Sequence, residues 1–444
     1  MKKIIAFLSL VMCAMFITGC SPRLVAPTGE VNMLKASEVL VYEDYIYYGG
    51  KYTSNSSMVD GDNKNADLDA MYRVKLVDGE IEYDEDGNVK NVEKVVSKVV
   101  GTENAFVRAY GDLIVFASPN THKTEQSKTA FDRTTYFKMN SNGKGLKELY
   151  TTKSAVKQQS LFAIDDDLFI VCYDGENIVK IDVNAGTHKI LAENVTSVAF
   201  AGEYKTEFDK DVYFTVEREQ ESELYAEVTG TILNKVNVVS EEPSELRKIA
   251  FETLSLKAQK DGYIFYTRTA DEGTFYYANN FETGTFDGNE VKLTADVLSD
   301  TNITNFTPLG VDEEGEMLPI IFTYSSKLAF SEFGSLAVQE LLASSPTILF
   351  ADGEYVYYST SDGLYRVSYR DKLPQLISEK TDIKTNVSFD GKYVYFYAKN
   401  EDNTTGNYYM YRADVTYAEN NNGVKEELLS KLHEDDIKEN EESN

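Results

Sequence analysis

The chain has 444 residues, with 44 basic and 73 acidic side chains, and its formal charge at pH 7 is −29. Binding to nucleic acid and electrostatic binding to anionic lipid both need a basic face, so this charge excludes them as functions. Three cysteines, three histidines and no tryptophan leave little material for disulfides or for a transition-metal site.

Residues 1–19 have the features of a secretory signal peptide. Lys2 and Lys3 precede an apolar run over residues 4–17, which is too short to span a bilayer. The segment Ile17-Thr18-Gly19-Cys20 that ends this run resembles a bacterial lipobox. The resemblance implies cleavage before Cys20 and attachment of lipid, such as palmitate, to that residue. We therefore expect an exported protein anchored by lipid in the cell membrane, at its extracytoplasmic face. The alternatives are an uncleaved anchor and an ordinary signal peptide.

Cleavage before Cys20 changes the properties of the remaining chain. It removes Lys2 and Lys3, so the formal charge becomes −31, and the lipid must hold the protein at the membrane against repulsion. With Cys20 lipidated, Cys172 is the one thiol left, and it lies in an apolar run that predicts a buried small side chain. We expect residues 20–35 to form a tether.

A four-part pattern recurs from about residue 38 to residue 430. It consists of a short apolar strand, a turn rich in Asp and Gly, an aromatic strand, and a second aromatic strand that leads into a fourth. In the clearest copy the four strands are 348–350, 355–358, 364–367 and 375–377, and the turn is 352–353. Residues that mark the second strand lie 36 to 68 positions apart: Ile46, Ile114, Phe169, Tyr213, Ile264, Ile320, Val356 and Val394.

This pattern predicts an all-β fold. Four strands per unit, repeating at roughly 40–50 residues with insertions, are typical of β-propeller blades. Continuous apolar runs suit strands that are covered on both faces by neighbouring blades. We predict one β-propeller domain over residues 36–430, and the count of units favours eight blades over seven. Stacked β-sandwiches and an open β-solenoid are the alternatives.

One copy of the repeat also resembles a known family. The aromatic strand 136–139 is followed by a turn rich in Asn and Gly at 140–145 and by Leu146-x-x-Leu149. This order is similar to the repeat of TolB-type and low-density-receptor-type β-propellers. The resemblance implies the fold and carries little about function, because propellers host many activities.

The connections between the second and third strands are the long ones, and they predict a binding face. They cover residues 49–69, 118–134, 217–230 and 399–407, and function concentrates in loops that a rigid scaffold holds. This face is acidic, which favours a cationic partner. The candidate binding residues are Asp60, Asp62, Asp67, Asp69, His122, Glu221, Glu223, Glu401 and Asp402. Neutral loop variation is the alternative explanation. The acidic tail 431–444 is expected to be disordered.

No motif in the chain predicts catalysis. The histidines His122, His188 and His433 lie far apart, and there is no Gly-x-Ser-x-Gly elbow and no phosphate-binding glycine loop. The loop that begins at Asp84 resembles a calcium loop, but Val89 and Val95 occupy its sixth and twelfth positions. We therefore predict no catalytic residue, no metal and no cofactor.

The sequence favours a surface lipoprotein whose propeller is a non-catalytic binding scaffold. Its partner would be an exported protein, a cationic peptide or a wall polysaccharide. One alternative is a cell-surface polysaccharide lyase or glycosidase, because paired carboxylates are defined by space rather than by sequence. Another is the sensory domain of an envelope signalling complex.

Overall fold

The computed structural model describes most of the chain after the first 32 residues. The described residues are 33, 35, 37–54, 68–85, 88–119, 133–164, 167–201, 207–220, 228–250, 253–270, 273–280, 290–293, 303–312, 314–344, 346–401, 404–419 and 423–432. The predicted signal peptide, Cys20 and most of the acidic tail lie outside this part.

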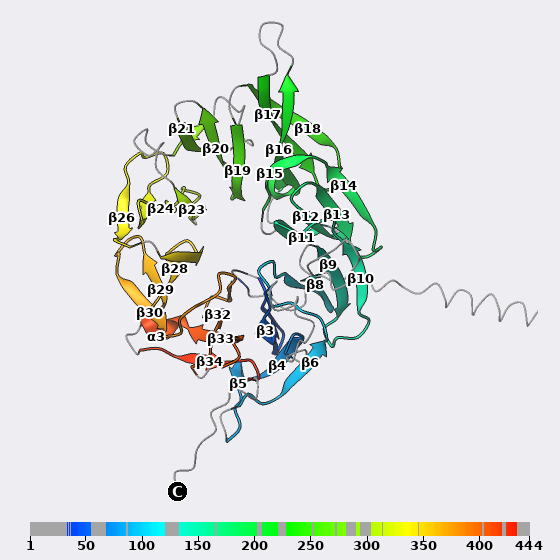
Figure 1. The fold of residues 1–444 in the computed structure, drawn as a ribbon, viewed down its shortest axis with the longest axis vertical. Coiled ribbons are helices and arrows are strands. Elements are labelled where there is room, and N and C mark those ends of the chain that lie inside the picture. The colour runs from blue at the N-terminus through cyan, green and yellow to red at the C-terminus, as the bar shows by residue number, and fades with distance from the viewer. Residues whose placement is uncertain are drawn as a thin grey trace, which may run out of the picture.

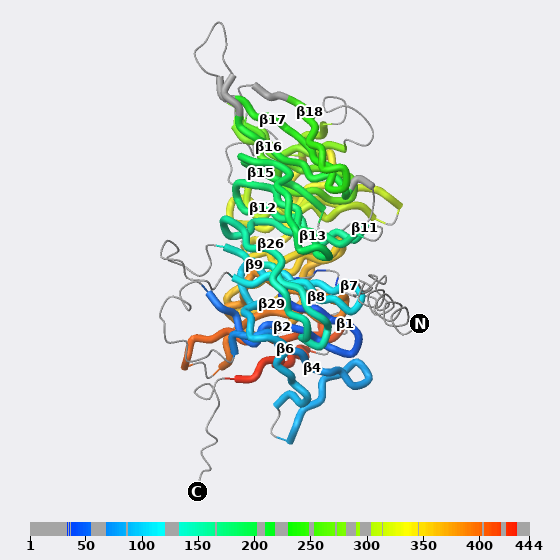
Figure 2. Tube along the Cα trace, turned by 90° about the vertical axis from the view of Figure 1, so that its right-hand side faces the viewer, coloured from blue at the N-terminus to red at the C-terminus, as the bar shows by residue number. Residues whose placement is uncertain are grey.

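The described residues form a β-propeller of eight four-stranded blades around a central axis (Figure 1). All strand pairs within the blades are antiparallel, and in each blade the strand that comes first in the chain lies nearest the axis. Seen edge-on in Figure 2, the ring is a narrow disc. The predicted fold class and the predicted blade count are both confirmed.

The blades follow one another in chain order. From the innermost strand outward, blade 1 consists of β1 (Leu40–Tyr42), β2 (Tyr45–Gly49), β4 (Met71–Val77) and β6 (Val92–Val96), and blade 2 of β7 (Val107–Tyr110), β8 (Leu113–Pro119), β9 (Thr134–Asn140) and β10 (Lys147–Thr151). Blade 3 consists of β11 (Gln158–Ile164), β12 (Asp167–Tyr173), β13 (Ile178–Asp182) and β14 (His188–Ala192), and blade 4 of β15 (Val195–Ala199), β16 (Asp211–Gln220), β17 (Val228–Asn237) and β18 (Pro243–Ala250).

In the same order, blade 5 consists of β19 (Thr253–Lys260), β20 (Tyr263–Ala270), β21 (Gly273–Asn279) and β22 (Val291–Lys292), and blade 6 of β23 (Thr304–Pro308), β24 (Ile320–Tyr324), β25 (Lys327–Ser331) and β26 (Gln339–Leu342). Blade 7 consists of β27 (Thr347–Ala351), β28 (Tyr355–Thr360), β29 (Gly363–Ser368) and β30 (Pro374–Ser378), and blade 8 of β31 (Ser388–Phe389), β32 (Tyr393–Ala398), β33 (Tyr408–Asp414) and β34 (Glu426–Leu428). The short elements β3 (Lys51–Tyr52), β5 (Glu80–Ile81), η1 (Glu207–Lys210) and α3 (Val415–Glu419) complete the described structure.

The hydrophobic core is divided among the interfaces between neighbouring blades. In β12, for example, Leu168, Ile170 and Cys172 pack toward blade 2, whereas Phe169 and Val171 pack toward blade 4. Because successive side chains of a strand point to opposite faces, a strand between two blades must be apolar at every position. This explains the continuous apolar runs in the sequence and the burial of Cys172, whose pKa burial raises to about 12.

A repeated polar tie stabilises the turns between first and second strands. In blade 8, Asp390 accepts hydrogen bonds from the backbone N–H groups of Lys392 (2.9 Å) and Tyr393 (2.6 Å), and its other oxygen accepts from the Tyr395 hydroxyl (2.7 Å). In blade 7, Asp352 makes the same three contacts, the last with Tyr357. An Asp in such a turn satisfies backbone donors that the strands leave unpaired.

The ring is closed by the first described residues rather than by an exchanged blade strand. Lys35 pairs with Phe389 through two backbone hydrogen bonds of 3.0 and 2.8 Å, and the Ser388 hydroxyl accepts from the N–H groups of Ser37 and Val39. We call residues 33–39, described at 33, 35 and 37–39, the closing segment. Because Met33 is already buried against blade 8, the propeller begins slightly before residue 36, within the range expected for the tether.

A second element crosses the same seam between blades 8 and 1. Strand β3 follows β2 of blade 1 but pairs with β33 of blade 8, with Lys51 opposite Tyr409 and Tyr52 opposite Tyr408. The seam is thus joined by the closing segment near the axis and by β3 farther out. Among the described residues no helix is long and apolar enough to cross a membrane.

Candidate functional site

The two faces of the disc carry different connections. Because neighbouring strands are antiparallel, the turns between first and second strands lie on one face, which we call the turn face. The connections between second and third strands lie on the opposite face, together with the links from one blade to the next. We call this the loop face, and it is the face that the sequence predicted to bind a partner.

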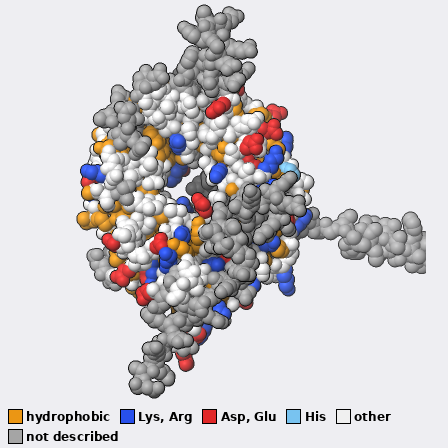
Figure 3. All heavy atoms as spheres, viewed as in Figure 1, with side chains coloured by type: hydrophobic (Ala, Val, Ile, Leu, Met, Phe, Trp, Pro, Cys, Tyr) orange, Lys and Arg blue, Asp and Glu red, His pale blue; other side chains and the backbone are white. Residues whose placement is uncertain are grey.

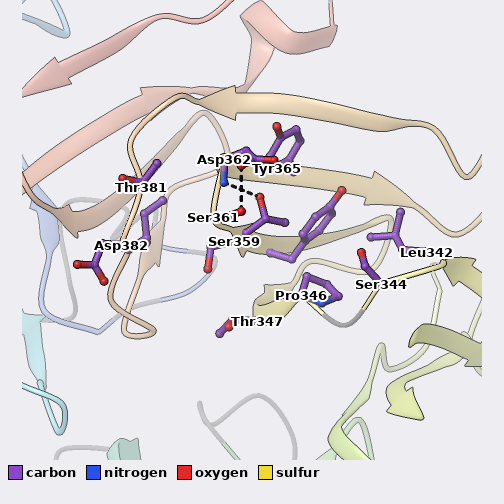
Figure 4. Close-up of a pocket in the computed structure, with 13 residues that line it drawn as sticks. Leu342, Ser344, Pro346, Thr347, Ser359, Ser361, Asp362, Tyr365, Thr381 and Asp382 are labelled. Atoms are coloured by element: carbon purple, nitrogen blue, oxygen red, sulfur yellow. Dashed lines mark hydrogen bonds between the residues drawn. The ribbon is translucent and has the colours of Figure 1, made fainter. Parts of the chain in front are cut away.

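The loop face holds an open cleft of about 890 Å³ over blades 6, 7 and 8 (Figure 4). Its floor is the short turn between β28 and β29, and its two walls are the links that enter and leave blade 7. The residues that line it are Leu342, Ser344, Pro346, Thr347, Tyr358, Ser359, Thr360, Ser361, Asp362, Tyr365, Thr381, Asp382 and Ile383. Most of these side chains carry a hydroxyl or a carboxylate.

The turn at the floor of the cleft is held by its own side chains. The Thr360 hydroxyl accepts a hydrogen bond from the Asp362 backbone N–H (3.1 Å), and the Ser361 hydroxyl donates to the Asp362 carboxylate (2.9 Å). Ser361 and Asp362 are exposed, so the hydroxyl and the carboxylate remain available to a ligand. Pre-formed polar groups on a rigid turn are what a binding site needs to fix the orientation of a ligand.

Two tyrosines provide the aromatic part of the cleft. The rings of Tyr358 and Tyr365 are stacked, with centroids 5.6 Å apart and planes 13° apart. Burial raises the pKa of Tyr358 to about 12, so its phenol is neutral at physiological pH. Tyr365 is only half-buried and borders the cleft (Figure 4). A ring edge beside several hydroxyls can pack against the apolar face of a polar ligand.

The wall formed by the link to blade 8 is charged. Asp382 receives a hydrogen bond from the Tyr408 hydroxyl (2.8 Å) and lies 2.6 Å from the Lys399 ammonium. The hydrogen bonds from Lys399 and Tyr408 hold the pKa of Asp382 below its usual range. The Lys384 ammonium lies 3.6 Å from the centre of the Tyr408 ring. At this wall the cleft is therefore bordered by a fixed carboxylate, that of Asp382, which is held from behind by Lys399 and Tyr408.

Two of the predicted binding residues fall in the described part, and they differ in role. Asp69 is a predicted binding residue of the loop face, but the structure buries its side chain. Its side chain is 5% exposed, accepts a hydrogen bond from Thr53 (2.5 Å) and lies 3.5 Å from the Lys51 ammonium. It belongs to the buried seam because β3 returns the chain to blade 8. Glu401 is exposed, 3.6 Å from Lys380.

The other candidate binding residues lie outside the described residues: Asp60, Asp62, Asp67, His122, Glu221, Glu223 and Asp402. The cleft residues were missed because sequence reasoning followed the long connections, whereas the floor of the cleft is a short turn. The available signal was the run Ser359-Thr360-Ser361-Asp362 between two tyrosine-rich strands. In the part of the chain that the structure describes, no three His, Cys, Asp or Glu side chains are placed to hold a metal ion.

Comparison with known proteins gives likenesses of fold. No family model matches the chain, and no curated protein is similar to it in sequence. A puromycin-hydrolysing peptidase of Mycobacterium tuberculosis aligns with 74% of this chain at 14% identity and a TM-score of 0.47, and the chain spans about half (53%) of that protein's length. TolB of Acinetobacter baumannii aligns with 60% of this chain and 64% of its own, at 13% identity and a TM-score of 0.34.

An oligogalacturonate lyase solved with manganese aligns with 68% of this chain and 86% of its own, at 13% identity and a TM-score of 0.42. The similar structures thus include TolB, a peptidase and a lyase. At such identities the likeness concerns the β-propeller fold and not activity.

Proposed function

We propose that this protein is a lipid-anchored, non-catalytic binding protein of the extracytoplasmic membrane face, and that the cleft on its loop face holds an extended polar polymer of the cell wall. The observation that carries the proposal is the composition of the cleft. Hydroxyls from Ser344, Thr347 and Ser361 surround an open space that the Tyr365 ring borders. Such groups exchange hydrogen bonds with a polyhydroxylated chain, and the ring packs against it.

The route of the chain supports the anchoring part of the proposal. Lys35 pairs with Phe389, which directly precedes the turn at Asp390, and Met33 belongs to the same hydrophobic cluster as Tyr393 and Tyr395, which follow this turn. Met33, the first described residue, therefore lies toward the turn face. From a lipid on Cys20, an extended chain reaches at most about 45 Å. The turn face would then be directed toward the membrane, and the loop face away from it.

The cleft supports binding better than acid–base catalysis. A glycosidase needs one carboxyl group that is protonated near neutral pH, and therefore has a raised pKa, beside a second carboxylate. Asp362 and Asp382 border the same cleft, but both are exposed. The pKa of Asp382 is lowered, so this residue does not hold a proton at neutral pH.

Co-sedimentation of the mature protein with purified cell wall tests the cleft. We expect the wild type to sediment with the wall. Asp362→Lys, which places a long cationic side chain in the cleft, should lose at least fivefold in bound fraction. Glu354→Lys on the turn face is the matched control for charge and should bind as the wild type does. Equal binding by the cleft variant would contradict the proposal.

Release from cells tests the anchor separately. Cys20→Ser should move the protein from the membrane fraction to the medium and abolish its labelling by palmitate. If the wild type carried no palmitate label but was still retained by cells, lipidation would be contradicted. This result would not affect the cleft proposal, which co-sedimentation tests separately.

A further inference from the structure

The exposed apolar side chains of the propeller occupy one recurring position. Among the described residues, the large hydrophobic side chains that remain 40% to 65% exposed are Val77, Leu146, Val239, Leu336 and Leu373. Each stands at the connection between the third and the fourth strand of its blade, in blades 1, 2, 4, 6 and 7. Because neighbouring strands are antiparallel, these connections lie on the turn face, at its outer rim. The described part of the loop face exposes no such side chain.

The turns themselves do not need these side chains. At Leu373 the backbone N–H donates a hydrogen bond to the Asp371 carboxylate (3.0 Å), and at Val239 it donates to the Asn237 side-chain oxygen (3.0 Å). The turns keep their shape through backbone groups and polar side chains, while the apolar groups stay in water. Single exposed apolar residues are common on protein surfaces, but a set confined to one face indicates contact with another surface.

The rim is basic on the side where the chain enters the propeller. Leu146 lies in the connection 141–147, which contains two lysines and no acidic residue, and Leu373 lies in the connection 369–374, which contains two basic residues and one acidic residue. These connections belong to blades 2 and 7, on either side of blades 8 and 1, where the closing segment lies (Figure 1). Basic side chains beside an exposed leucine can reach lipid phosphates while their stems cover apolar surface.

The two basic residues of blade 7 have neutral hydrogen-bond partners. Arg370 donates to the Tyr369 hydroxyl (3.4 Å), and Lys372 donates to the Gln339 side-chain oxygen (3.3 Å). Both basic residues are exposed. They therefore add positive charge to the surface beside Leu373.

In blade 1 the rim is acidic in sequence, but cations of blade 8 surround one of its carboxylates. Glu80 belongs to the turn that follows Val77. Its carboxylate oxygens lie 3.7 Å from Lys392, 3.7 Å from Arg412 and 3.9 Å from Lys425. The local charge at Val77 is therefore less negative than the turn alone would make it.

The rim of blade 4 differs from this side. Val239 lies in the connection 238–242, which contains two acidic residues and no basic one. Its Glu241 already pairs with Lys180 (2.8 Å) and Lys189 (2.6 Å) of blade 3. Blade 4 also lies across the ring from blade 8 and the closing segment (Figure 1). Val239 thus offers an exposed apolar side chain at the same kind of turn, far from the entry of the chain.

We propose that the turn face rests on the membrane along blades 7, 8, 1 and 2, with Leu373, Val77 and Leu146 entering the lipid headgroup region. This rests on the anchoring part of the proposed function, because the chain from Cys20 to Met33 spans at most about 45 Å and keeps this side of the ring near the bilayer. Three contact points spread over several blades suit a flat, extended partner. The cleft on the loop face is then directed away from the membrane.

The negative charge of the chain does not oppose this contact at every point. Although the formal charge is −29, acidic and basic side chains are interspersed over the face of the ring seen in Figure 3. The proposed contact is apolar, and the anchor brings it within reach. It therefore does not require electrostatic attraction of the whole protein to lipid.

The chain contains no tryptophan, so one introduced indole reports on its own position. Leu146→Trp and Leu373→Trp place it at the proposed contact, and Val239→Trp is the matched control across the ring. Each protein, produced from Cys20 onward, is coupled through the Cys20 thiol to a maleimide lipid in phosphatidylcholine vesicles. Cys172 is buried and its pKa is raised to about 12, so it should not react.

Lipids brominated in their acyl chains quench an indole that enters the bilayer. We expect them to quench Leu146→Trp and Leu373→Trp at least threefold more than Val239→Trp, and vesicles to shift only the first two emission spectra to shorter wavelength. Equal quenching at all three positions, or no quenching at Leu146→Trp and Leu373→Trp, would overturn the proposal. Because the coupling is chemical, these outcomes do not depend on lipidation by the cell, which palmitate labelling tests separately.

A second experiment removes any effect of the indole's own affinity for membranes. With Val77→Trp as the reporter, Leu146→Ser together with Leu373→Ser should remove at least half of the quenching, whereas Val239→Ser should leave it unchanged. Quenching that survives loss of both leucines would contradict their role. A blue shift that grows with protein concentration without vesicles would assign the rim to a second copy of the chain and would also overturn the proposal.

Discussion

On the turn face of blades 7 and 8 the same contacts occur twice, whereas on the loop face the corresponding connections share no pattern. Asp352 and Asp390 each accept two backbone N–H groups and one tyrosine hydroxyl. On the loop face, the turn at Asp362 is short and rich in hydroxyls, whereas Asn407 takes part in a buried polar contact with Lys51. The repeated positions build the scaffold, and the unrepeated positions are free to differ in function.

This contrast can be tested by stability, beginning at the buried seam. Lys51→Met leaves the Asp69 carboxylate buried without its cation; the two side chains are 4% and 5% exposed and 3.5 Å apart. Removing one partner of a buried ion pair costs about 3–5 kcal/mol of unfolding free energy. We expect the urea midpoint to fall accordingly. The double variant Lys51→Met with Asp69→Leu should recover much of the loss.

An exposed pair gives the matched control for this experiment. Lys327 lies 2.6 Å from Glu340, but both side chains are more than 40% exposed, and exposed ion pairs contribute little to stability. Lys327→Met should therefore leave the urea midpoint nearly unchanged. A Lys51→Met protein as stable as this control would show that the seam does not depend on the ion pair.

The closing segment gives the next largest effect, and it depends on pH. Burial raises the pKa of Glu38 from its ordinary value of 4.5 to about 7 in the folded protein. The folded state therefore binds the proton more tightly, and stability is lost as the pH rises from about 4.5 to 7, by up to about 3 kcal/mol. The loss is complete above pH 7, where the group is ionised in both states.

Glu38→Gln removes this titration. We expect the variant to be more stable than the wild type at pH 8, by up to about 3 kcal/mol, and the difference to shrink toward pH 4.5. Urea unfolding at several pH values measures it, and subtracting the two curves cancels the other titrating groups. A difference that does not change with pH would mean that Glu38 ionises normally in the folded protein.

The repeated tie on the turn face should have a smaller effect. Tyr395→Phe removes the hydroxyl that donates a hydrogen bond of 2.7 Å to Asp390 and should lower the unfolding free energy by about 1–2 kcal/mol. Asp390→Ala also leaves two backbone N–H groups without their acceptor and should lower it by about 2–3 kcal/mol. Thermal unfolding of the two variants measures the difference. Equal costs would indicate that the turn is held by the backbone alone.

The sequence predicted the scaffold well, and the reason is physical. Strands such as 355–358 are apolar at every position because they lie between two blades, and turns such as Asp352-Gly353 repeat because they cap the strands in the same way. Ring closure depends on contacts that occur once and not on a repeat, so the same reasoning does not predict it. The structure shows that Lys35 adds to β31 and that β3 crosses to blade 8.

The candidate site was predicted poorly because its residues have no common pattern. Asp69 belongs to a loop that is acidic in the sequence, but the crossing of β3 buries it beside Lys51. Ser344, Ser361 and Thr381 come from three separate connections and meet only when blades 6, 7 and 8 are in place. Hydroxyl side chains are common in exposed turns, so their convergence is a property of space and not of the sequence.

The smallest expected change in stability is that of a substitution in the cleft, and it can be compared directly with the same substitution on the turn face. Asp362 is exposed and its carboxylate accepts a hydrogen bond from the exposed Ser361, so Asp362→Ala should change the unfolding free energy by no more than about 0.5 kcal/mol. The same substitution at Asp390 on the turn face should cost several times more. If the loop face is the binding face, the two variants should rank in the opposite order in co-sedimentation with cell wall. Asp362→Ala should weaken binding to the wall. Asp390→Ala should bind as the wild type does, at temperatures where this variant is folded. A loss of binding that follows stability in both variants would place the contact with the partner elsewhere than the cleft.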